Sequence, residues 1–339
     1  MKIAVVGATG LVGSKMLQVL AERGFQDHEI IAAASPKSVG REIPFDHRTL
    51  EVLSVEDAIA QRPDYALFSA GATVSKEYAP QFAAVGCVVI DNSSAWRMDA
   101  NVPLVVPEIN FHAVKPDHKI IANPNCSTIQ MVLALSGLHL RYAIRRIVVS
   151  TYQSVTGTGM KAIRQLELEE QMGSSRAGNS GISSPASQMA YPYPIHRNLF
   201  PHGGDFLPDA YTTEEHKLVD ETRKILGDDS IQVSATVARV PVTGGHSESI
   251  NVEFNNEYEI SEARDIIAHT SGVVLYDDPQ ELRYPMPIIS EGNDSVFVGR
   301  IRRDPSQPKT LNLWVVADNL RKGAATNAVQ ILQQCVARQ

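Results

Sequence analysis

The feature that most constrains the fold of this chain is the alternation of short apolar runs with amphipathic segments before residue 125. Runs typical of strands occur at 2–6, 29–34, 65–69, 86–91 and 119–122, with helical patterns at 11–23 and 76–85. Short apolar strands separated by helices are typical of a parallel sheet that is covered on both faces. We therefore expect a Rossmann-type, doubly wound α/β domain in the N-terminal part of the chain.

A different pattern begins after residue 140. Strand-like segments lie at 145–155, 233–242, 246–254, 296–303 and 310–317, with helical patterns at 158–172, 213–226 and 261–269. In one of these strands Ile250, Val252 and Phe254 alternate with polar residues, which is typical of a sheet with one buried face. These patterns predict a second, mixed α/β (α+β) domain.

Two further segments have a distinct character. The stretch 173–210 is rich in Gly, Ser, Pro and Tyr, which predicts a long ordered excursion. Loops of that length in a compact domain are usually functional or lie at an interface. The final segment, 321–336, is amphipathic and predicts a helix that could return to pack on the first domain.

Length, charge and cysteine content exclude several classes of protein. A chain of 339 residues fits two domains, and its net charge of −7 disfavours binding to nucleic acid, which needs a basic face. No apolar run approaches the roughly 20 residues needed to span a bilayer, and the chain begins with a strand-like segment rather than a signal or transit peptide. Three widely spaced cysteines form neither a disulfide framework nor a metal-ligand pair, which predicts a cytoplasmic protein without a bound metal.

A glycine-rich segment, Gly7-Ala8-Thr9-Gly10-Leu11-Val12-Gly13, joins the first expected strand to the first expected helix. Its G-x-x-G-x-x-G spacing is a variant of the dinucleotide-binding pattern, in which glycines permit a tight turn, an approach to the pyrophosphate and close helix packing. The helix N-terminus would bind the anion. The expected cofactor contacts are Gly7, Thr9, Gly10, Leu11, Val12 and Gly13. A glycine-rich turn of another doubly wound fold is the alternative.

The end of the second expected strand indicates which nicotinamide cofactor is bound. An NAD site usually places Asp or Glu there to bind the ribose 2′-hydroxyl. Here Ala34 is followed by Ser35, Pro36, Lys37 and Ser38, and no acid is present. The hydroxyls of Ser35 and Ser38 and the cation of Lys37 suit a 2′-phosphate, which indicates NADP. A solvated turn is the alternative, because these residue types are common in turns.

Cys126 lies in the segment Asn123-Pro124-Asn125-Cys126-Ser127-Thr128-Ile129-Gln130, between a strand-like and a helix-like run. This places the thiol at or near a helix N-terminus, where the positive end of the dipole stabilises a thiolate. A thiolate beside a nicotinamide site suggests aldehyde oxidation through a thiohemiacetal and a thioester. Cys87 and Cys335 lie in apolar segments and are expected to be buried and inert.

The segment N-P-N-C-S-T-I-Q resembles the active-site signature of aspartate-semialdehyde dehydrogenases. Matching motifs follow one another along essentially the whole chain: G-A-T-G-L-V-G at 7–13, D-N-S-S-A-W-R at 91–97, T-Y-Q-S-V-T-G-T-G at 151–159, R-V-P-V-T-G-G-H at 239–246 and D-N-L-R-K-G-A-A at 318–325. The resemblance implies an NADP-binding domain at 1–126 that the C-terminal helix 318–339 completes. It also implies a catalytic, substrate-binding and dimerisation domain at 127–317, and a homodimer.

The resemblance also assigns catalytic roles. Cys126 becomes the nucleophile, and Gln153 orients the reacting carbonyl beside it. His246 becomes the general acid and base, and an imidazole with a pKa near neutrality suits that role. Gly157 and Gly159 would let the backbone approach the nicotinamide. Asn319, in the last matching motif, completes the expected cofactor contacts.

The substrate contacts follow in the same way. Arg239 would bind the α-carboxylate through its planar fork of N–H donors. Glu214 would bind the substrate ammonium, and Lys217 would bind phosphate with Arg97 as its partner; Asn125 is a further substrate contact. By itself, Thr213-Glu214-Glu215-His216-Lys217 is typical of a helix N-terminus with acids in its first turn. Composition leaves open whether Glu214 or Glu215 faces the amine.

The reaction implied by the resemblance is the reversible, NADPH-dependent reduction of 4-phospho-L-aspartate to L-aspartate 4-semialdehyde and phosphate, without a metal. Its place is the aspartate branch of amino-acid biosynthesis, toward lysine or diaminopimelate, threonine and methionine. Another acyl phosphate, such as N-acetylglutamyl phosphate, is one alternative, but its blocked amine would leave Glu214 without a purpose, and that family places Gly before its Cys. A non-catalytic NADP-binding protein is the second alternative.

Overall fold

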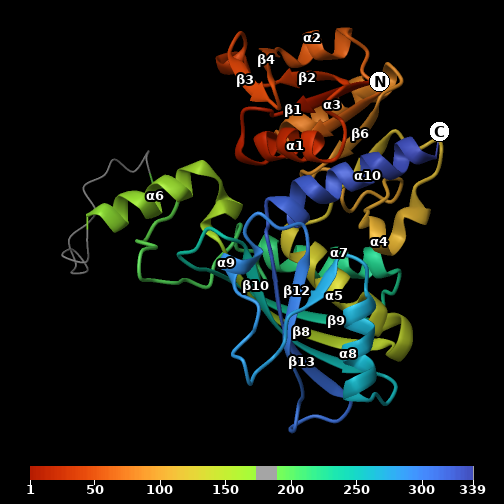
Figure 1. Cartoon of the computed structure of the whole chain (residues 1–339), viewed down its shortest axis with the longest axis vertical. Coiled ribbons are helices and arrows are strands. Elements are labelled where there is room, and N and C mark those ends of the chain that lie inside the picture. Colours follow the sequence, from red (N-terminus) through yellow and green to blue (C-terminus); the bar gives the residue numbers. More distant parts are fainter. Residues whose placement is uncertain (173–188, 339) are drawn as a thin grey trace. The chain divides into compact units, whose positions relative to one another are not determined.

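The computed structural model describes residues 1–172 and 189–338, and the chain folds into two compact units (Figure 1). Unit 1 consists of residues 1–136, 220–230 and 320–339. Unit 2 consists of residues 137–219 and 231–319. The domain limits expected after residues 126 and 317 stay a prediction.

Unit 1 contains a seven-stranded sheet in the order β3-β4-β2-β1-β5-β6-β7. Its strands are β1 (Lys2–Val6), β2 (Glu29–Ala33), β3 (Glu42–Phe45), β4 (Arg48–Leu53), β5 (Tyr65–Phe68), β6 (Val88–Asp91) and β7 (Ile120–Ala122). All neighbours pair in parallel except β3, which runs antiparallel to β4 at the edge. The expected doubly wound sheet is confirmed, and β3 and β4 extend it by a hairpin that the apolar pattern did not predict.

Helices cover both faces of this sheet, as the sequence predicts. They are α1 (Leu11–Glu22) and α10 (Thr326–Ala337) on one face, and α2 (Val55–Ala60) and α3 (Ala72–Ala84) on the other; unit 1 also contains α4 (Pro107–Asn110) and the start of α5 (Cys126–Tyr142). Along β1, Ile3 and Val5 join a buried cluster that includes α1 and α10, whereas Ala4 and Val6 join a second cluster with α3. The C-terminal helix therefore packs on the first domain, which confirms the expectation from its amphipathic pattern.

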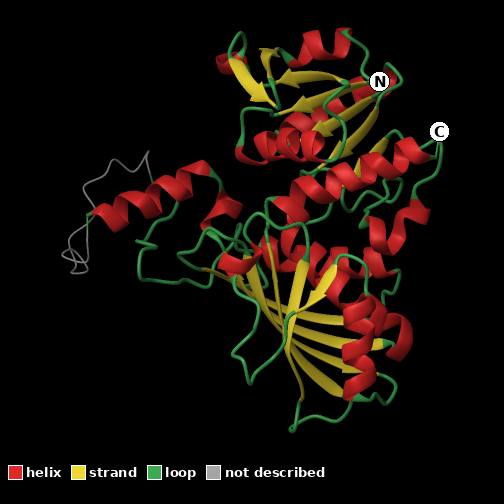
Figure 2. Ribbon diagram, in the orientation of Figure 1, coloured by secondary structure: helices red, strands yellow, loops and turns green. Residues whose placement is uncertain are grey.

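Unit 2 contains a six-stranded mixed sheet in the order β11-β12-β13-β10-β8-β9 (Figure 2). Its strands are β8 (Ile144–Gln153), β9 (Gln232–Arg239), β10 (His246–Phe254), β11 (Val273–Leu275), β12 (Val296–Arg303) and β13 (Thr310–Ala317). Its helices are α6 (Met160–Gln171), α8 (Ile260–His269) and α9 (Pro287–Ser290), with a short 3₁₀ turn at Val155–Thr158. Ile250, Val252 and Phe254 of β10 are buried, as their alternation predicts.

Helix α7 (Thr213–Leu226) contributes to both units, because the division falls between Val219 and Asp220. Among its charged residues, Glu214, Lys217, Glu221 and Lys224 follow the spacing i, i+3, i+7, i+10, which places these four on one helix face. The first two belong to unit 2 and the last two to unit 1. One short helix therefore supplies charged groups to each unit.

The excursion expected at 173–210 is only partly described, because residues 173–188 lie outside the described part of the chain. Residues 190–196 are held against helix α6. Buried Gln165 and Glu169 accept hydrogen bonds from four backbone N–H groups of this segment, at 2.7–2.9 Å. Buried side chains of α6 thus satisfy the backbone of a segment that has no strand or helix of its own.

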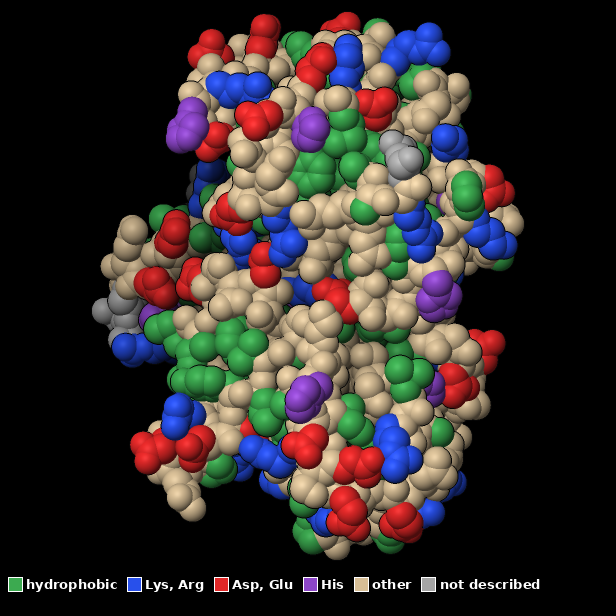
Figure 3. Space-filling model, turned by 45° about the vertical axis from the view of Figure 1, so that its right-hand side comes forward, with side chains coloured by type: hydrophobic (Ala, Val, Ile, Leu, Met, Phe, Trp, Pro, Cys, Tyr) green, Lys and Arg blue, Asp and Glu red, His purple; other side chains and the backbone are tan. Residues whose placement is uncertain are grey.

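The described part of the chain has a face of mixed charge, and its helices are short or polar (Figure 3). On the face drawn in Figure 3, acidic and basic side chains are interspersed rather than separated into areas of one sign. Among the residues that the structure describes, no helix is long and apolar enough to cross a bilayer.

A buried lysine fixes the start of the C-terminal segment to unit 1. Lys322 lies in a π-helical turn (Arg321–Ala325) and is fully buried. Its Nζ donates to both carboxylate oxygens of Glu108 at 2.8 Å, to Asn327 at 3.1 Å and to Gln330 at 2.7 Å. A buried ammonium needs such a full set of acceptors, because desolvation of the charge is costly.

Replacing Lys322 by Met should destabilise the protein strongly. The variant leaves the Glu108 carboxylate, whose side chain is 11% exposed, without its cation, and breaking a buried pair costs about 3–5 kcal/mol. Arg145→Met is the control, because Arg145 pairs with Glu253 while 63% exposed, and such pairs contribute about 0–1 kcal/mol. Urea unfolding followed by circular dichroism measures both. Equal losses of unfolding free energy in Lys322→Met and Arg145→Met would contradict this account.

Candidate active site

The glycine-rich turn of unit 1 has the geometry that a dinucleotide requires. Gly7 has a φ of 89°, and a Cβ there would lie 2.5 Å from the carbonyl oxygen of Ser69. A Cβ on Gly13 would lie 2.0 Å from the carbonyl oxygen of Gly7, so helix α1 packs directly on the turn. Gly10 precedes the helix, whose first residues are Leu11 and Val12. The turn therefore presents backbone N–H groups at a helix N-terminus, which fits a pyrophosphate.

The end of β2 lies against this turn. The hydroxyls of Thr9 and Ser38 are 3.4 Å apart, and residues Pro36–Ser38 form a short 3₁₀ helix. Ser38 is buried, whereas Ser35 and Lys37 are exposed. The structure thus brings the two expected parts of the nucleotide site together, with hydroxyls and a cation in place of an acid.

Helix α5 begins at Cys126, as predicted, and Asn125 caps it. The Asn125 Oδ1 accepts hydrogen bonds from the N–H groups of Ser127, at 3.0 Å, and Thr128, at 3.3 Å. Asn side chains are preferred at this position because they satisfy helix N–H groups. Asn125, expected as a substrate contact, therefore also fixes the first turn of the helix that carries the thiol.

The three cysteines differ in environment. Cys126 is partly exposed, whereas burial raises the pKa of the Cys87 thiol to about 12 and that of the Cys335 thiol to about 11. A thiol with so high a pKa carries no thiolate at neutral pH and is a poor nucleophile. Cys87 and Cys335 therefore fit the inert role expected for them.

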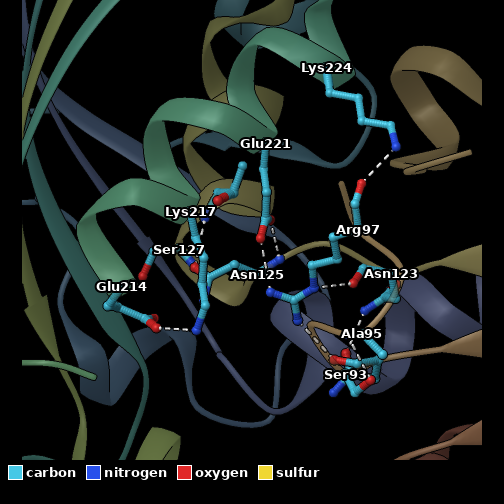
Figure 4. Close-up of polar contacts among 12 residues, drawn as sticks. Ser93, Ala95, Arg97, Asn123, Asn125, Ser127, Glu214, Lys217, Glu221 and Lys224 are labelled. Atoms are coloured by element: carbon cyan, nitrogen blue, oxygen red, sulfur yellow. Dashed lines mark hydrogen bonds and ion pairs between the residues drawn. The ribbon is translucent and has the colours of Figure 1, made fainter. Parts of the chain in front are cut away.

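Arg97 is buried and makes hydrogen bonds through all three guanidinium nitrogens (Figure 4). Its Nε donates to the Asn123 carbonyl at 3.0 Å, and its Nη2 donates to the Asn92 carbonyl at 2.8 Å. Its Nη1 pairs with Glu221 of α7 at 3.0 Å. Sequence reasoning did not identify Glu221. Lys217, the partner expected for Arg97, belongs to unit 2, so their joint binding of phosphate stays a prediction.

In unit 2, the sheet topology gathers residues from four strand ends. Gln153 ends β8, and Arg239 ends the parallel β9 beside it; the two are paired in register. His246 begins the antiparallel β10 and pairs with Ala317 at the end of β13, two residues before Asn319. All four expected residues therefore lie at the same end of one sheet, although 166 positions of sequence separate the first from the last (319 − 153).

The turn after β8 connects these groups. The Ser154 N–H donates to Nδ1 of His246 at 3.0 Å, and Arg239 Nη1 donates to the Ser154 carbonyl at 3.0 Å. The Thr156 hydroxyl donates to the Asn319 side chain at 2.8 Å. A Cβ on Gly157 would lie 2.8 Å from Arg239 Nη1 and 3.1 Å from His246 Nε2. A larger residue at position 157 would therefore require Arg239 or His246 to shift.

The expectation that His246 has a pKa near neutrality is wrong for the free protein. Burial and then the Arg239 guanidinium lower its pKa from 6.5 to about 3, while Glu214 acts in the opposite direction. Since Nδ1 accepts from the Ser154 N–H, the neutral ring carries its proton on Nε2. His246 is therefore a neutral hydrogen-bond donor. The sequence could not show this, because burial of the ring depends on the tertiary structure.

The structure distinguishes the two adjacent acids of α7. Glu215 accepts from the N–H and hydroxyl of Thr212, at 2.7 and 2.9 Å, and from the Val237 N–H at 3.0 Å. Its own N–H donates to the Thr212 hydroxyl, which completes a capping box. Glu214 instead pairs with Lys217 at 2.8 Å and acts electrostatically on His246. Glu214 is thus the acid on the side of the strand-end cluster.

Among the described residues, no group of His, Cys, Asp or Glu is arranged to hold a metal ion. The described groups are instead a thiol at a helix N-terminus, a nucleotide turn, a neutral imidazole, and a guanidinium with a carboxylate nearby. In unit 1 the turn suits a nucleotide and the thiol suits covalent attack on a carbonyl, whereas in unit 2 the guanidinium, the carboxylate and the imidazole suit a small zwitterionic compound.

Two family models match the chain. The model described as "Semialdehyde dehydrogenase, NAD binding domain" matches residues 2–116, and "Semialdehyde dehydrogenase, dimerisation domain" matches residues 135–322. Together with the fold and the site, these matches define a two-domain semialdehyde dehydrogenase.

Individual relatives specify the family further. The chain is 51% identical to the aspartate-semialdehyde dehydrogenase of Aquifex aeolicus, over 99% of this chain and 98% of the relative. It is 48% identical to that of Legionella pneumophila, over 98% and 95%. The crystal structure of aspartate semialdehyde dehydrogenase II from Vibrio cholerae superposes with a TM-score of 0.92 at 41% identity, over 99% and 98% of the two chains. The chain belongs to the aspartate-semialdehyde dehydrogenase family.

Gly157→Ala should impair turnover of the semialdehyde strongly. The added Cβ would displace Arg239 or His246, and misplacing reacting groups by about 1 Å can cost on the order of 100-fold in rate. Steady-state kinetics measures the loss. Gly24→Ala is the control for a general loss of stability: Gly24 has a positive φ of 86°, which strains an added side chain, but nothing lies within 4 Å of its Cβ, so this variant should lose stability and keep its kinetics. Similar kinetics for Gly157→Ala and the wild type would show that this turn does not shape the site.

Proposed function

We propose that this chain catalyses the reversible, NADPH-dependent conversion of 4-phospho-L-aspartate to L-aspartate 4-semialdehyde and phosphate, with Cys126 as the covalent nucleophile. The observation that carries the proposal is the strand-end cluster of Arg239, His246 and Gln153, with Glu214 acting on it. A guanidinium and a carboxylate beside a hydrogen-bond donor complement the carboxylate, the ammonium and the carbonyl oxygen of an aspartyl group. A structure of the V. cholerae relative is described as complexed with ASA, which supports this substrate class.

The first chemical step is assigned to Cys126. Its thiolate attacks the acyl carbon, a C–S bond forms, and the C–O bond to phosphate breaks with phosphate leaving as the anion. Lys217 and Arg97 are the cations proposed to bind that phosphate. NADPH, when bound at the Gly7–Gly13 turn, supplies the hydride that reduces the thioester.

His246 and Gln153 act on the substrate oxygen in this proposal. Reduction of the thioester leaves a thiohemiacetal anion, whose negative oxygen needs a hydrogen-bond donor. The Nε2–H of neutral His246 supplies that donor, and Gln153 orients the carbonyl. Collapse of the anion to aldehyde and Cys126 thiolate needs no net proton, so a neutral imidazole suffices. The low pKa of His246 is therefore compatible with catalysis.

We also propose NADP as the cofactor and a homodimer as the working form. The cofactor rests on Ser35, Lys37 and Ser38 beside the nucleotide turn, where an NAD site would carry an acid. Gly157, Gly159 and Asn319 would lie on the nicotinamide side. The dimer rests on the match of residues 135–322 to a dimerisation domain. The pathway we propose is the aspartate branch, toward lysine or diaminopimelate, threonine and methionine.

The test of the proposed function is phosphate-dependent reduction of NADP by the purified protein with L-aspartate 4-semialdehyde. Cys126→Ala should remove this turnover by a factor of about 10⁴ or more, because the covalent route is lost, and should leave NADP binding unchanged. Fluorescence titration with NADPH measures the binding. Full turnover in Cys126→Ala would exclude the thioester mechanism, and wild-type turnover that does not need phosphate would exclude the acyl phosphate as the product.

Lys37→Ala should discriminate between the two cofactors. Losing the cation beside a 2′-phosphate should raise the KM for NADPH about 10-fold, corresponding to one charge-assisted hydrogen bond, and leave the weak use of NADH unchanged. The comparison is the ratio of kcat/KM for the two cofactors in variant and wild type. Arg62→Ala, at an exposed turn in the same unit, is the control. An unchanged ratio of the two kcat/KM values would show that residues 35–38 form a solvated turn and do not bind the 2′-phosphate.

The pH dependence follows from the lowered pKa of His246. The ring is charged only below pH about 3, so kcat/KM between pH 6 and 8 should show no limb that belongs to it. His246→Gln should lower the rate but keep the same limbs, since Gln also offers a neutral N–H donor. A wild-type limb near pH 6.5 that disappears in His246→Gln would instead assign a general acid or base to this residue.

A further inference from the structure

We propose that Glu221 is a positioning residue, which fixes the nucleophile segment and the Arg97 guanidinium relative to each other. The inference rests on the proposed function in that it takes Cys126 as the nucleophile. It goes beyond that function because no role there belongs to Glu221. Its basis is a buried carboxylate on α7 that contacts both the residue before Cys126 and the buried arginine (Figure 4).

The contacts of Glu221 are short and completely buried. One carboxylate oxygen accepts the backbone N–H of Asn125 at 2.6 Å, and the other pairs with Arg97 Nη1 at 3.0 Å. The side chain of Glu221 is 1% exposed and that of Arg97 is 9% exposed. Both oxygens of the carboxylate are thus used, each on a different segment of unit 1.

These two contacts control the position of Cys126 through its neighbour. The Asn125 N–H donates to the Glu221 carboxylate, while the Asn125 side chain caps helix α5 by accepting from the N–H groups of Ser127 and Thr128. The residue before the thiol is therefore held from two sides. Rotation of the Asn125 peptide would break the cap and leave the Glu221 oxygen without its donor, so the carboxylate restricts the direction of the Cys126 side chain.

Lys224 reinforces the same arrangement one helical turn later. Its Nζ donates to the carbonyl oxygens of Arg97 and Asp99, both at 2.7 Å, and of Val102 at 2.9 Å. Glu221 therefore binds the side chain of Arg97 while Lys224 binds its backbone. Arg97 is fixed at both ends by residues three positions apart on one helix, which is the spacing that places them on the same face.

A purely stabilising role explains this arrangement poorly. Desolvation of a buried ion pair often cancels its attraction, so a buried pair by itself is weak evidence for stability. The same charges also set the electrostatics of the nucleophile, because Glu221 partly neutralises Arg97. Without the Glu221 carboxylate, the charge of Arg97 would no longer be neutralised, and a positive charge near Cys126 favours its thiolate form. The Asn125–Cys126 segment would at the same time lose the contact that fixes its position.

The decisive variant is Glu221→Gln, with Glu221→Asp beside it. Glu221→Gln should lower kcat for semialdehyde oxidation at least about 10-fold and leave the KM for the semialdehyde unchanged, since the orientation of the Cys126 thiolate is lost. It should also shift the alkylation of Cys126 by iodoacetamide to lower pH, measured by mass spectrometry of the Cys126 peptide. Asp keeps the charge but shortens the reach, so it should lower kcat without that shift.

Asp277→Asn is the matched control. Asp277 is a carboxylate that is 2% exposed, pairs with Arg264 and accepts the backbone N–H of Arg300, but it lies in unit 2 and contacts no proposed site residue. This variant should lose stability while kcat and Cys126 alkylation stay at the wild-type level. Equal effects of Asp277→Asn and Glu221→Gln on kcat would show general destabilisation and overturn the proposal.

Two further outcomes decide whether Glu221 positions the nucleophile segment. A folded Glu221→Gln variant with wild-type kcat and wild-type alkylation overturns it. If neither Glu221 variant folds, hydrogen exchange of the wild-type Asn125 amide decides: slow exchange supports the contact, and exchange as fast as in exposed loops overturns it. Absence of turnover in the wild type would instead overturn the proposed function, while alkylation and exchange would still report on Glu221.

Discussion

Buried backbone N–H groups at the ends of strands and helices need acceptors, and this requirement places most of the candidate site. The Asn125 N–H is satisfied by Glu221, and the Ser154 N–H is satisfied by Nδ1 of His246. The Val237 N–H is satisfied by Glu215, which thereby leaves Glu214 to face the strand-end cluster. Side chains that accept these hydrogen bonds cannot rotate freely. The bonds that satisfy the backbone N–H groups therefore also fix the orientation of Glu221, His246 and Glu215.

The sequence predicted the parts of the fold that depend on local pattern. Cys126 at a helix start followed from Pro124 and the apolar run after it, and the return of the C-terminal helix followed from its amphipathic stripe. The hairpin β3-β4 was missed because its strands have a mixed polarity, and β11 was missed because it has only three residues. Their pairing depends on neighbours in the sheet, which a single segment does not reveal.

The candidate site shows the same limit. Glu221 was missed because a charged residue in a helical pattern usually indicates a solvated face, and its partner Arg97 lies 124 positions away. The different environments of Glu214 and Glu215 depend on Thr212 and Val237, which bind the second acid only in the folded chain, and which acid faces the substrate amine stays a prediction. The pKa of His246 was expected near neutrality because burial and the charge of Arg239 are properties of the folded protein.

The central claim, that Cys126 carries the substrate covalently, is tested most directly without any cofactor. Wild-type protein mixed with 4-phospho-L-aspartate in the absence of NADPH should release phosphate once per site and retain one aspartyl group. Intact-mass and peptide mass spectrometry should locate that group on Cys126. An unmodified protein that still turns over when NADPH is added, or an aspartyl group on another residue, would contradict the account.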